Sequence, residues 1–417
     1  MIPLTPTPGQ LAWQSDQMGV FFHFGINTFH GKEWSEGTLP AASFNPGELD
    51  AGQWVQTAQD AGAKYVVLTA KHHDGFCLWP SETTDYSVAS SPWRNGCGDV
   101  VAEVSAACRK RGMKFGIYLS PWDRNAACYP DTGAYDEFYL RQLRELCSNY
   151  GELCELWFDG AGSQGREYDW PGISALIDDL QPGAMVFNMG SPTIRWVGNE
   201  DGLAVDPVNY VVDRTDFSNY TVHTAKLEEA LYLPPECDVS IRRGWFWHPD
   251  DQPKDVAHLL AIYYRSIGLG ANLLLNLPPD TRGLIPEGDV ARLREFSDEV
   301  RRRFAAPSVA SLNAVGEGQW VAEFAEATSL DHLRLAEDLN GGQRVTGHRI
   351  RDGDGQVLVA AGTIGAQRIH VFPATKAKRF TIELDGDNPV LASVAGFSTG
   401  VESIPEIGYL ATTDVPD

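Results

Sequence analysis

Short apolar runs and amphipathic stretches alternate regularly through the first two thirds of the chain. Runs such as GVFFHFGIN (19–27) and YVVLTAKHH (65–73) have the length and the aromatic and β-branched content of buried strands. The stretch between them, LDAGQWVQTAQDAG (49–62), repeats apolar residues at helical spacing and ends on glycine. Such alternation is typical of a parallel sheet covered by helices.

Eight strands are predicted, at 19–27, 65–73, 114–121, 153–160, 185–190, 194–202, 237–248 and 272–279. Helices are predicted at 49–62, 99–112, 135–151, 169–182, 255–268 and 286–304. No clear helix separates the sixth strand from the seventh, so the pattern predicts an α/β fold, a (β/α)8-like barrel with an irregular second half. An open doubly wound sheet is the structural alternative, but no G-x-G-x-x-G motif follows the first strand.

The pattern of the sequence changes after Ala305-Ala306-Pro307. From there, short alternating runs are separated by Gly, Asn and Asp, which is typical of antiparallel strands. We therefore expect a catalytic barrel over residues 1–305 and a C-terminal β-sandwich over 306–417, whose main role is to brace the barrel.

Composition bears on partners and location. The formal charge of −23 and the lack of long Lys/Arg clusters argue against nucleic acid. No apolar run reaches the length of a membrane span, and the N-terminus lacks the features of a signal peptide. The seven cysteines include no C-x-x-C pair, which indicates reduced thiols. We expect a cytoplasmic protein without nucleic-acid or membrane partners.

Polar and aromatic residues gather where the predicted strands end. They are His23, His72, His73, Tyr118, Trp157, Asp159, Glu200 and Trp245. In a (β/α)8 barrel the carboxyl ends of the strands and the loops after them form the active face. Each residue alone is compatible with an ordinary core position, but together they predict one site.

The residues at these ends favour one chemistry over several others. On an extended strand, the adjacent His72 and His73 would point to opposite faces, and no H-E-x-x-H motif is present. No metal or cofactor is therefore predicted, although a metal-dependent hydrolase stays an alternative. Neither G-x-S-x-G nor a phosphate-binding glycine loop occurs. Carboxylates among His, Trp and Tyr favour glycoside cleavage, for which a retaining enzyme needs two carboxyl groups roughly 5–5.5 Å apart.

Several motifs together resemble the α-L-fucosidases of glycoside hydrolase family twenty-nine. They are GVFFHFGINTF (19–29), GKEW (31–34), KHHDGFCLWPS (71–81), GIYLSPWD (116–123), ELWFDG (155–160) and GLGANLLLNLPPD (268–280). The resemblance implies a barrel followed by a β-sandwich, no cofactor, and a fucosylated oligosaccharide or glycoconjugate as substrate. The alternative from another class is a fucose-binding protein without catalytic activity.

The resemblance also implies roles for individual residues. Asp159 would be the nucleophile that forms a covalent glycosyl-enzyme. The residues expected to bind fucose are His23, Glu33, Trp34, His72, His73, Tyr118 and Trp157. Trp245 would form a wall near the C5 methyl group, which favours fucose over galactose by roughly 1 kcal/mol.

The acid/base position varies within this family. Glu200 is our choice because it ends the stretch WVGNE (196–200), which resembles a branch that cleaves α-1,3- and α-1,4-linked fucose from Lewis-type glycans. The rival positions are Glu33, Glu228, Glu229 and Glu236. A broader fucosidase, acting on simple or α-1,2/1,6-linked fucosides, is the alternative. Trp122 and Asp123 are candidate contacts to a neighbouring galactose, with a turn cap as the other reading of Asp123.

Overall fold

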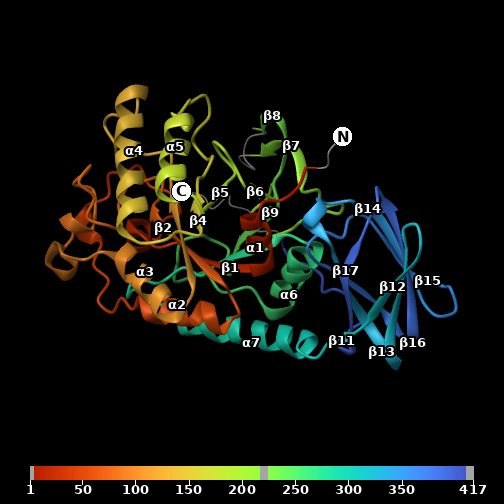
Figure 1. The fold of residues 1–417 in the computed structure, drawn as a ribbon. Helices are drawn as coiled ribbons and strands as arrows, with labels where there is room; N and C mark the ends of the chain where they lie inside the picture. Colours follow the sequence, from red (N-terminus) through yellow and green to blue (C-terminus); the bar gives the residue numbers. More distant parts are fainter. Residues whose placement is uncertain (1–3, 217–223, 410–417) are drawn as a thin grey trace.

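The computed structural model describes residues 4–216 and 224–409, and its larger part is a barrel of eight parallel strands enclosed by helices (Figure 1). The strands pair in the order β5-β4-β3-β2-β1-β10-β9-β6. They are β1 (Met18–Phe22), β2 (Tyr65–Lys71), β3 (Lys114–Leu119), β4 (Glu155–Trp157), β5 (Met185–Phe187), β6 (Arg195–Trp196), β9 (Pro235–Ser240) and β10 (Asn272–Asn276). A parallel bridge between Phe187 and Ile194 joins the two edges, so the barrel is nearly closed. The predicted fold class is confirmed.

Most of the helices outside the barrel begin after an aspartate that is visible in the sequence. They are α1 (Pro8–Asp16), α2 (Ala51–Asp60), α3 (Val100–Arg111), α4 (Thr132–Asn149), α5 (Trp170–Leu180), α6 (Val256–Arg265) and α7 (Glu287–Phe304). Each helix from α2 to α6 follows an aspartate whose side chain accepts a first-turn backbone N–H, namely Asp50, Asp99, Asp131, Asp169 and Asp255. Each cap stabilises its helix by about 1 kcal/mol. Helix α1 was not predicted.

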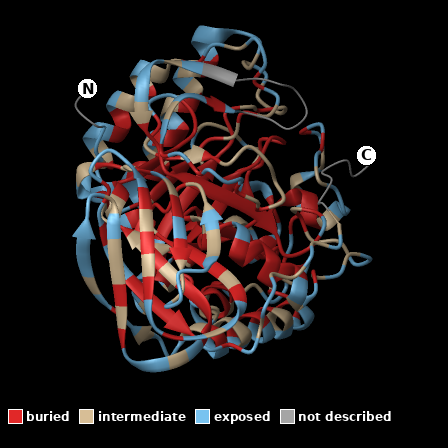
Figure 2. Cartoon of the chain, turned by 90° about the vertical axis from the view of Figure 1, so that its right-hand side faces the viewer, coloured by how far each residue is buried: buried red, intermediate tan, exposed pale blue. Residues whose placement is uncertain are grey.

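The barrel strands divide their side chains between two apolar cores. Val20 of β1 and Val66 of β2 face outward and pack in the large core beneath the helices. Phe21 and Val67, one residue further along, face inward and join a smaller core inside the barrel. Trp13 of α1 belongs to the inner core, so α1 contributes to the barrel interior. Figure 2 shows that buried segments are concentrated in the interior of the molecule.

The second half of the barrel is irregular, as predicted, but it contains an element that the sequence pattern did not predict. An antiparallel hairpin of β7 (Val211–Asp216) and β8 (Thr224–Tyr232) occupies the connection between β6 and β9. Most described residues of this hairpin are exposed. Its polar, weakly alternating sequence therefore lacks the apolar face by which a buried strand is recognised.

The C-terminal part is the antiparallel sandwich that the sequence predicted (Figure 1). Its strands are β11 (Ser308–Val309), β12 (Ser311–Gly316), β13 (Gln319–Glu337), β14 (Val345–Arg351), β15 (Val357–Ala361), β16 (Arg368–Gly386) and β17 (Leu391–Phe397). Polar contacts join it to the barrel: the buried Tyr264 hydroxyl lies 2.7 Å from Nε2 of His332, and Arg368 pairs with the more exposed Asp206 at 2.9 Å. The predicted division at residues 305 and 306 falls between α7 and β11.

Two further features bear on the expected location. In the described ranges, no helix combines the length and the apolar character required to cross a bilayer. All seven cysteines are free thiols. The cytoplasmic location itself stays a prediction.

Candidate active site

An open cavity lies at the carboxyl ends of the barrel strands, with about 820 Å³ of space inside it and at its mouth. All ten predicted site residues line it: His23, Glu33, Trp34, His72, His73, Tyr118, Trp157, Asp159, Glu200 and Trp245. They come from the ends of β1, β2, β3, β4, β6 and β9 and from the loops that follow. The parallel barrel brings these ends together, so residues far apart in the chain share one site.

Asp159 lies two residues beyond the end of β4 and is held from two sides. Its Oδ2 accepts a hydrogen bond from the Tyr118 hydroxyl at 3.1 Å, and its Oδ1 accepts the backbone N–H of Ala161 at 2.8 Å. The side chain keeps 26% of its surface exposed. The carboxylate is therefore oriented and still accessible from the cavity, as a nucleophile must be.

The proton on His73 can be placed from its neighbours. The Ser120 hydroxyl donates to the carbonyl oxygen of Trp122 at 2.6 Å, so its oxygen must accept the hydrogen bond from Nδ1 of His73 at 2.7 Å. Burial lowers the pKa of His73, although the charge of Asp159 opposes this. Neutral His73 then presents an unprotonated Nε2, 3.6 Å from Oδ2 of Asp159, which is able to accept a ligand hydroxyl.

The other two histidines are also neutral acceptors in the cavity. Nδ2 of Asn276 donates to the carbonyl of Trp245, so Oδ1 faces His23 and accepts from its Nδ1 at 2.9 Å. Burial lowers the pKa of His23 to about 3. Burial and the neighbouring histidines hold the pKa of His72 well below its ordinary value. Neutral imidazole nitrogens suit the recognition of hydroxyl groups.

The prediction that His72 and His73 point to opposite faces is wrong. Strand β2 ends at Lys71, and the chain turns at once, so the two residues do not continue the extended conformation. Their ring centroids lie 4.1 Å apart and both rings line the cavity. Within residues 4–216 and 224–409, no group of three or more His, Cys, Asp or Glu side chains is arranged to hold a metal ion.

Glu33 joins two loops at the edge of the cavity. Its carboxylate accepts the backbone N–H groups of Trp245 at 2.8 Å and of Phe246 at 3.3 Å. Burial raises its pKa to about 7, while these two hydrogen bonds oppose the shift. A Cβ at Gly244 would lie 2.3 Å from Oε1 of Glu33, so only glycine allows this close approach. Glu33 thereby fixes the Trp245 wall against His23, with ring centroids 4.9 Å apart.

Glu200 lines the cavity from the loop after β6, near an acid that the sequence analysis missed. Asp238 of β9 is buried, lines the same cavity, and accepts the Trp196 indole N–H at 2.6 Å. Burial, with a contribution from the charge of Glu200, raises the pKa of Asp238 well above its usual range. Its position beside Glu200 in a buried site therefore favours the protonated, uncharged form of Asp238.

The rivals of Glu200 are placed less favourably. Glu236 has no exposed surface and lies inside the barrel rather than on the wall of the cavity. Glu228 and Glu229 are exposed on β8 and are absent from the lining. Glu33 lines the cavity but its carboxylate binds the backbone of the β9–α6 loop.

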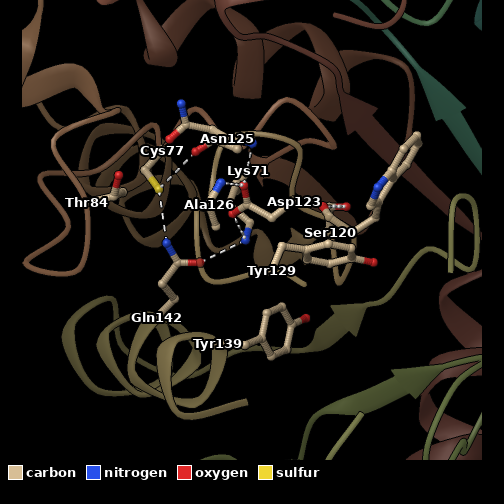
Figure 3. Close-up of polar contacts among 12 residues, drawn as sticks. Lys71, Cys77, Thr84, Ser120, Asp123, Asn125, Ala126, Tyr129, Tyr139 and Gln142 are labelled. Atoms are coloured by element: carbon tan, nitrogen blue, oxygen red, sulfur yellow. Dashed lines mark hydrogen bonds and ion pairs between the residues drawn. The ribbon is translucent and has the colours of Figure 1, made fainter. Parts of the chain in front are cut away.

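Asp123 is a turn cap, and the expectation that it contacts a neighbouring sugar is wrong. It is 2% exposed and pairs with the buried amino group of Lys71 at 2.9 Å, while its other oxygen accepts the N–H groups of Asn125 and Ala126. Figure 3 shows Lys71 between Asp123 and Gln142 of α4. The Lys71 amino group donates to Oε1 of Gln142 at 2.9 Å. This ion pair holds the loop that carries Ser120 and therefore supports His73.

The rim of the cavity is aromatic. The Trp34 side chain is 37% exposed, and its ring centroid lies 5.3 Å from that of His73 and 5.5 Å from that of Trp122. Trp122 in turn lies 5.2 Å from His73. The flat, exposed ring of Trp34 at the mouth of the cavity suits a ligand with one apolar face.

Further lining residues were missed by the sequence analysis: Phe21, Phe187, Asn188, Trp196, Asp238 and Arg243. A signal was available for some of them. Phe21 precedes His23 by two residues and so shares its face of the strand. Arg243 and Asn188 lie in loops, where no periodicity reveals direction.

Comparison with known proteins identifies relatives with the same architecture. The family model for α-L-fucosidases matches residues 5–302. α-L-Fucosidase 1 of Arabidopsis thaliana is 41% identical over 417 aligned residues, covering 89% of this chain and 82% of the plant protein. A candidate α-L-fucosidase from Bacteroides ovatus superposes with a TM-score of 0.89 at 42% identity, over 95% of this chain and 74% of that one. A Ruminococcus gnavus GH29 fucosidase in complex with fucose superposes with a TM-score of 0.83 at 29% identity, over 95% of each chain.

Proposed function

The chain belongs to the α-L-fucosidases of glycoside hydrolase family 29, and we propose that it releases α-1,3- or α-1,4-linked fucose from branched, Lewis-type glycans with retention of configuration. The observation that carries the proposal is that Asp159 and Glu200 line one cavity together with three histidines. Two carboxylic groups and a set of neutral acceptors are what cleavage of a hydroxyl-rich sugar needs.

In the first step, the Asp159 carboxylate attacks the anomeric carbon of fucose. The glycosidic C–O bond breaks as Glu200 donates its proton to the departing oxygen, and the sugar becomes esterified to Asp159. In the second step, Glu200 removes a proton from water, whose oxygen attacks the same carbon and releases Asp159. The hydrogen bonds from Tyr118 and Ala161 orient the attacking carboxylate throughout.

The fucose ring would be held mainly by the histidines. His23 and His73 each carry their proton on Nδ1, toward the protein, so Nε2 is left to accept a sugar hydroxyl. Trp245, fixed by Glu33, offers an apolar wall for the C5 methyl group. The fucose complex of the Ruminococcus gnavus relative supports a fucosyl ligand for this fold.

The proposed linkage rests on the stretch WVGNE, which ends in Glu200 and resembles the α-1,3/1,4-specific branch of the family. The aromatic rim of Trp34 and Trp122 supports this choice, because a branched glycan extends beyond the fucose and needs a surface outside the cavity. A broader enzyme would act equally well on a simple fucoside, which leaves this rim empty.

The test compares a Lewis-type trisaccharide with an aryl fucoside, using released fucose as the readout. We expect kcat/KM to be larger for the trisaccharide, and the first fucose observed by NMR to be the α-anomer. Comparable or larger values for the aryl fucoside would overturn the linkage, and a first β-anomer would overturn the retaining mechanism. Binding of the trisaccharide without any release of fucose would favour a carbohydrate-binding protein.

A further inference from the structure

Two glutamates lie inside the barrel, where the proposed chemistry gives them no role. Glu155 begins β4 and Glu236 lies on β9, and neither has any exposed surface. Each precedes a cavity residue on its own strand by two positions, Trp157 and Asp238, so both point inward. The Trp157 indole, on the same face of β4 as Glu155, donates its N–H to Glu236, so the two carboxyl groups lie close together inside the barrel.

Three of the four carboxyl oxygens have a donor from the surrounding barrel. Glu236 accepts the Tyr65 hydroxyl on Oε1 at 2.6 Å and the Trp157 indole N–H on Oε2 at 3.0 Å. Glu155 accepts the Trp13 indole N–H on Oε2 at 3.1 Å. The fourth oxygen, Oε1 of Glu155, is buried and has no hydrogen-bond donor within the described part of the chain.

A single proton accounts for this arrangement. Ionised carboxylates only accept hydrogen bonds, and two negative charges in contact repel each other strongly in a buried site. Burial raises the pKa of Glu155 well above its ordinary value, and the charge of Glu236 adds to the effect. With a proton on Oε1, Glu155 becomes a donor, and Glu236 is an anion that accepts from Tyr65, Trp157 and Glu155.

We propose that Glu155 and Glu236 share one proton, with the negative charge on Glu236, and that the pair positions Trp157 in the floor of the active-site cavity. Glu236 is then a positioning residue, since it acts on the substrate only through Trp157. The inference deepens the proposed function and rests on it, because the floor matters only if Asp159 reacts above it.

The contacts of Trp157 show how the pair would affect the reacting group. Its ring stacks on Phe187 with centroids 3.8 Å apart and on Tyr118 with centroids 5.5 Å apart. The Tyr118 hydroxyl donates to Asp159 at 3.1 Å. A rotation of the indole would therefore disturb both the floor of the cavity and the tyrosine that orients the carboxylate.

The two glutamates should respond differently to the same substitution. In Glu155→Gln the amide N–H replaces the acid O–H toward Glu236, and the amide oxygen still accepts from Trp13. In Glu236→Gln one acceptor oxygen becomes an NH₂ group. This group faces either the N–H of Trp157 or the O–H of Tyr65, and because both groups are donors, that hydrogen bond is lost. The loss of a hydrogen bond to a charged group corresponds to a change of about 10- to 100-fold in an equilibrium or rate constant.

The experiment measures kcat and KM for Glu155→Gln, Glu236→Gln, Trp157→Phe and the double variant Glu236→Gln/Trp157→Phe. We expect Glu155→Gln to keep kcat/KM within about threefold of the wild type, and Glu236→Gln to lose about tenfold or more. Trp157→Phe removes the N–H, so the double variant should lose little beyond the larger single loss. The infrared difference between wild type and Glu155→Gln at neutral pH should contain the carbonyl band of a protonated carboxylic acid.

Equal losses in the two glutamine variants, additive losses in the double variant, or a difference spectrum without the acid band would each overturn the proposal. If Glu236→Gln does not fold, the infrared difference spectrum still tests whether Glu155 carries the proton. Failure of the proposed function is distinguishable, because a wild-type protein that releases no fucose would still show the acid band.

Discussion

The Tyr118 hydroxyl donates a hydrogen bond to Oδ2 of Asp159 across 3.1 Å, joining the ends of β3 and β4. The register of the barrel sets this contact, because Tyr118 pairs with Trp157, two residues before Asp159. The ends of two neighbouring parallel strands thus place the Tyr118 hydroxyl and the Asp159 carboxylate side by side in the cavity.

Asp159→Asn should abolish turnover and leave the fold intact. The amide keeps the shape of the side chain and still accepts from the Ala161 N–H, but it is no longer a nucleophile. We expect kcat to fall by a factor on the order of 10³ or more, with an unchanged melting temperature. Fucose release and thermal unfolding measure the two effects. Residual activity within tenfold of the wild type would remove Asp159 from its proposed role.

Glu200→Ala should slow hydrolysis strongly, by a factor on the order of 10² to 10⁴, because the departing oxygen loses its proton donor. Added azide should restore part of the rate with activated substrates, since it attacks the glycosyl-enzyme without a general base. Glycosyl azide detected by mass spectrometry is the readout. Glu229→Ala, an exposed rival on β8, is the matched control and should retain the wild-type rate. Rescue by azide at Glu33→Ala, with none at Glu200→Ala, would reassign the acid/base.

Ser120→Ala should weaken substrate binding through His73. The hydroxyl fixes the proton of His73 on Nδ1, so its loss frees the ring to rotate and to exchange tautomers. We expect KM to rise about 10-fold, the size of one hydrogen bond, with a smaller change in kcat. Ser120→Thr, which keeps the hydroxyl, is the control. Nitrogen NMR of His73 should show the Nδ1–H tautomer in the wild type only; the same tautomer in Ser120→Ala would refute the assignment.

Glu33→Gln should flatten the pH dependence of stability near neutral pH. Burial raises the folded-state pKa of Glu33 from 4.5 to about 7. Between these values the folded protein binds more protons than the unfolded chain, so this group makes stability fall as pH rises. Melting temperatures of the variant and the wild type, measured from pH 5 to pH 8, should therefore converge or cross toward high pH. Glu36→Gln, at an exposed position, should run parallel to the wild type.

Lys71→Met should be among the most destabilising single changes at the active face. It leaves Asp123 buried without its cation, which costs about 3–5 kcal/mol in the free energy of unfolding. Denaturant unfolding measures the loss, with the exposed Lys64→Met as a control that should stay within about 0.5 kcal/mol of the wild type. A loss below about 1 kcal/mol for Lys71→Met would show that the pair contributes little to stability.

Much of the fold and of the cavity lining was accessible from the sequence, because the relevant signals are local. Asp50 and Asp99 mark helix starts whatever lies elsewhere in the chain. Asp159 follows an apolar strand, and in a parallel barrel a residue at the carboxyl end of a strand lies at the active face. Periodicity and end position therefore sufficed to place Asp159 and Tyr118 in one cavity.

Other features depended on the tertiary structure. Glu33 binds the backbone of Trp245 across 212 positions of sequence, and Glu155 meets Glu236 from a distant strand. The turn that brings the rings of His72 and His73 together begins where β2 ends, a point that the apolar run did not mark. Sequence patterns report which face a side chain takes relative to its own backbone. Which groups then meet, and which of them keeps a proton, is decided by the closure of the barrel and the exclusion of water from its interior.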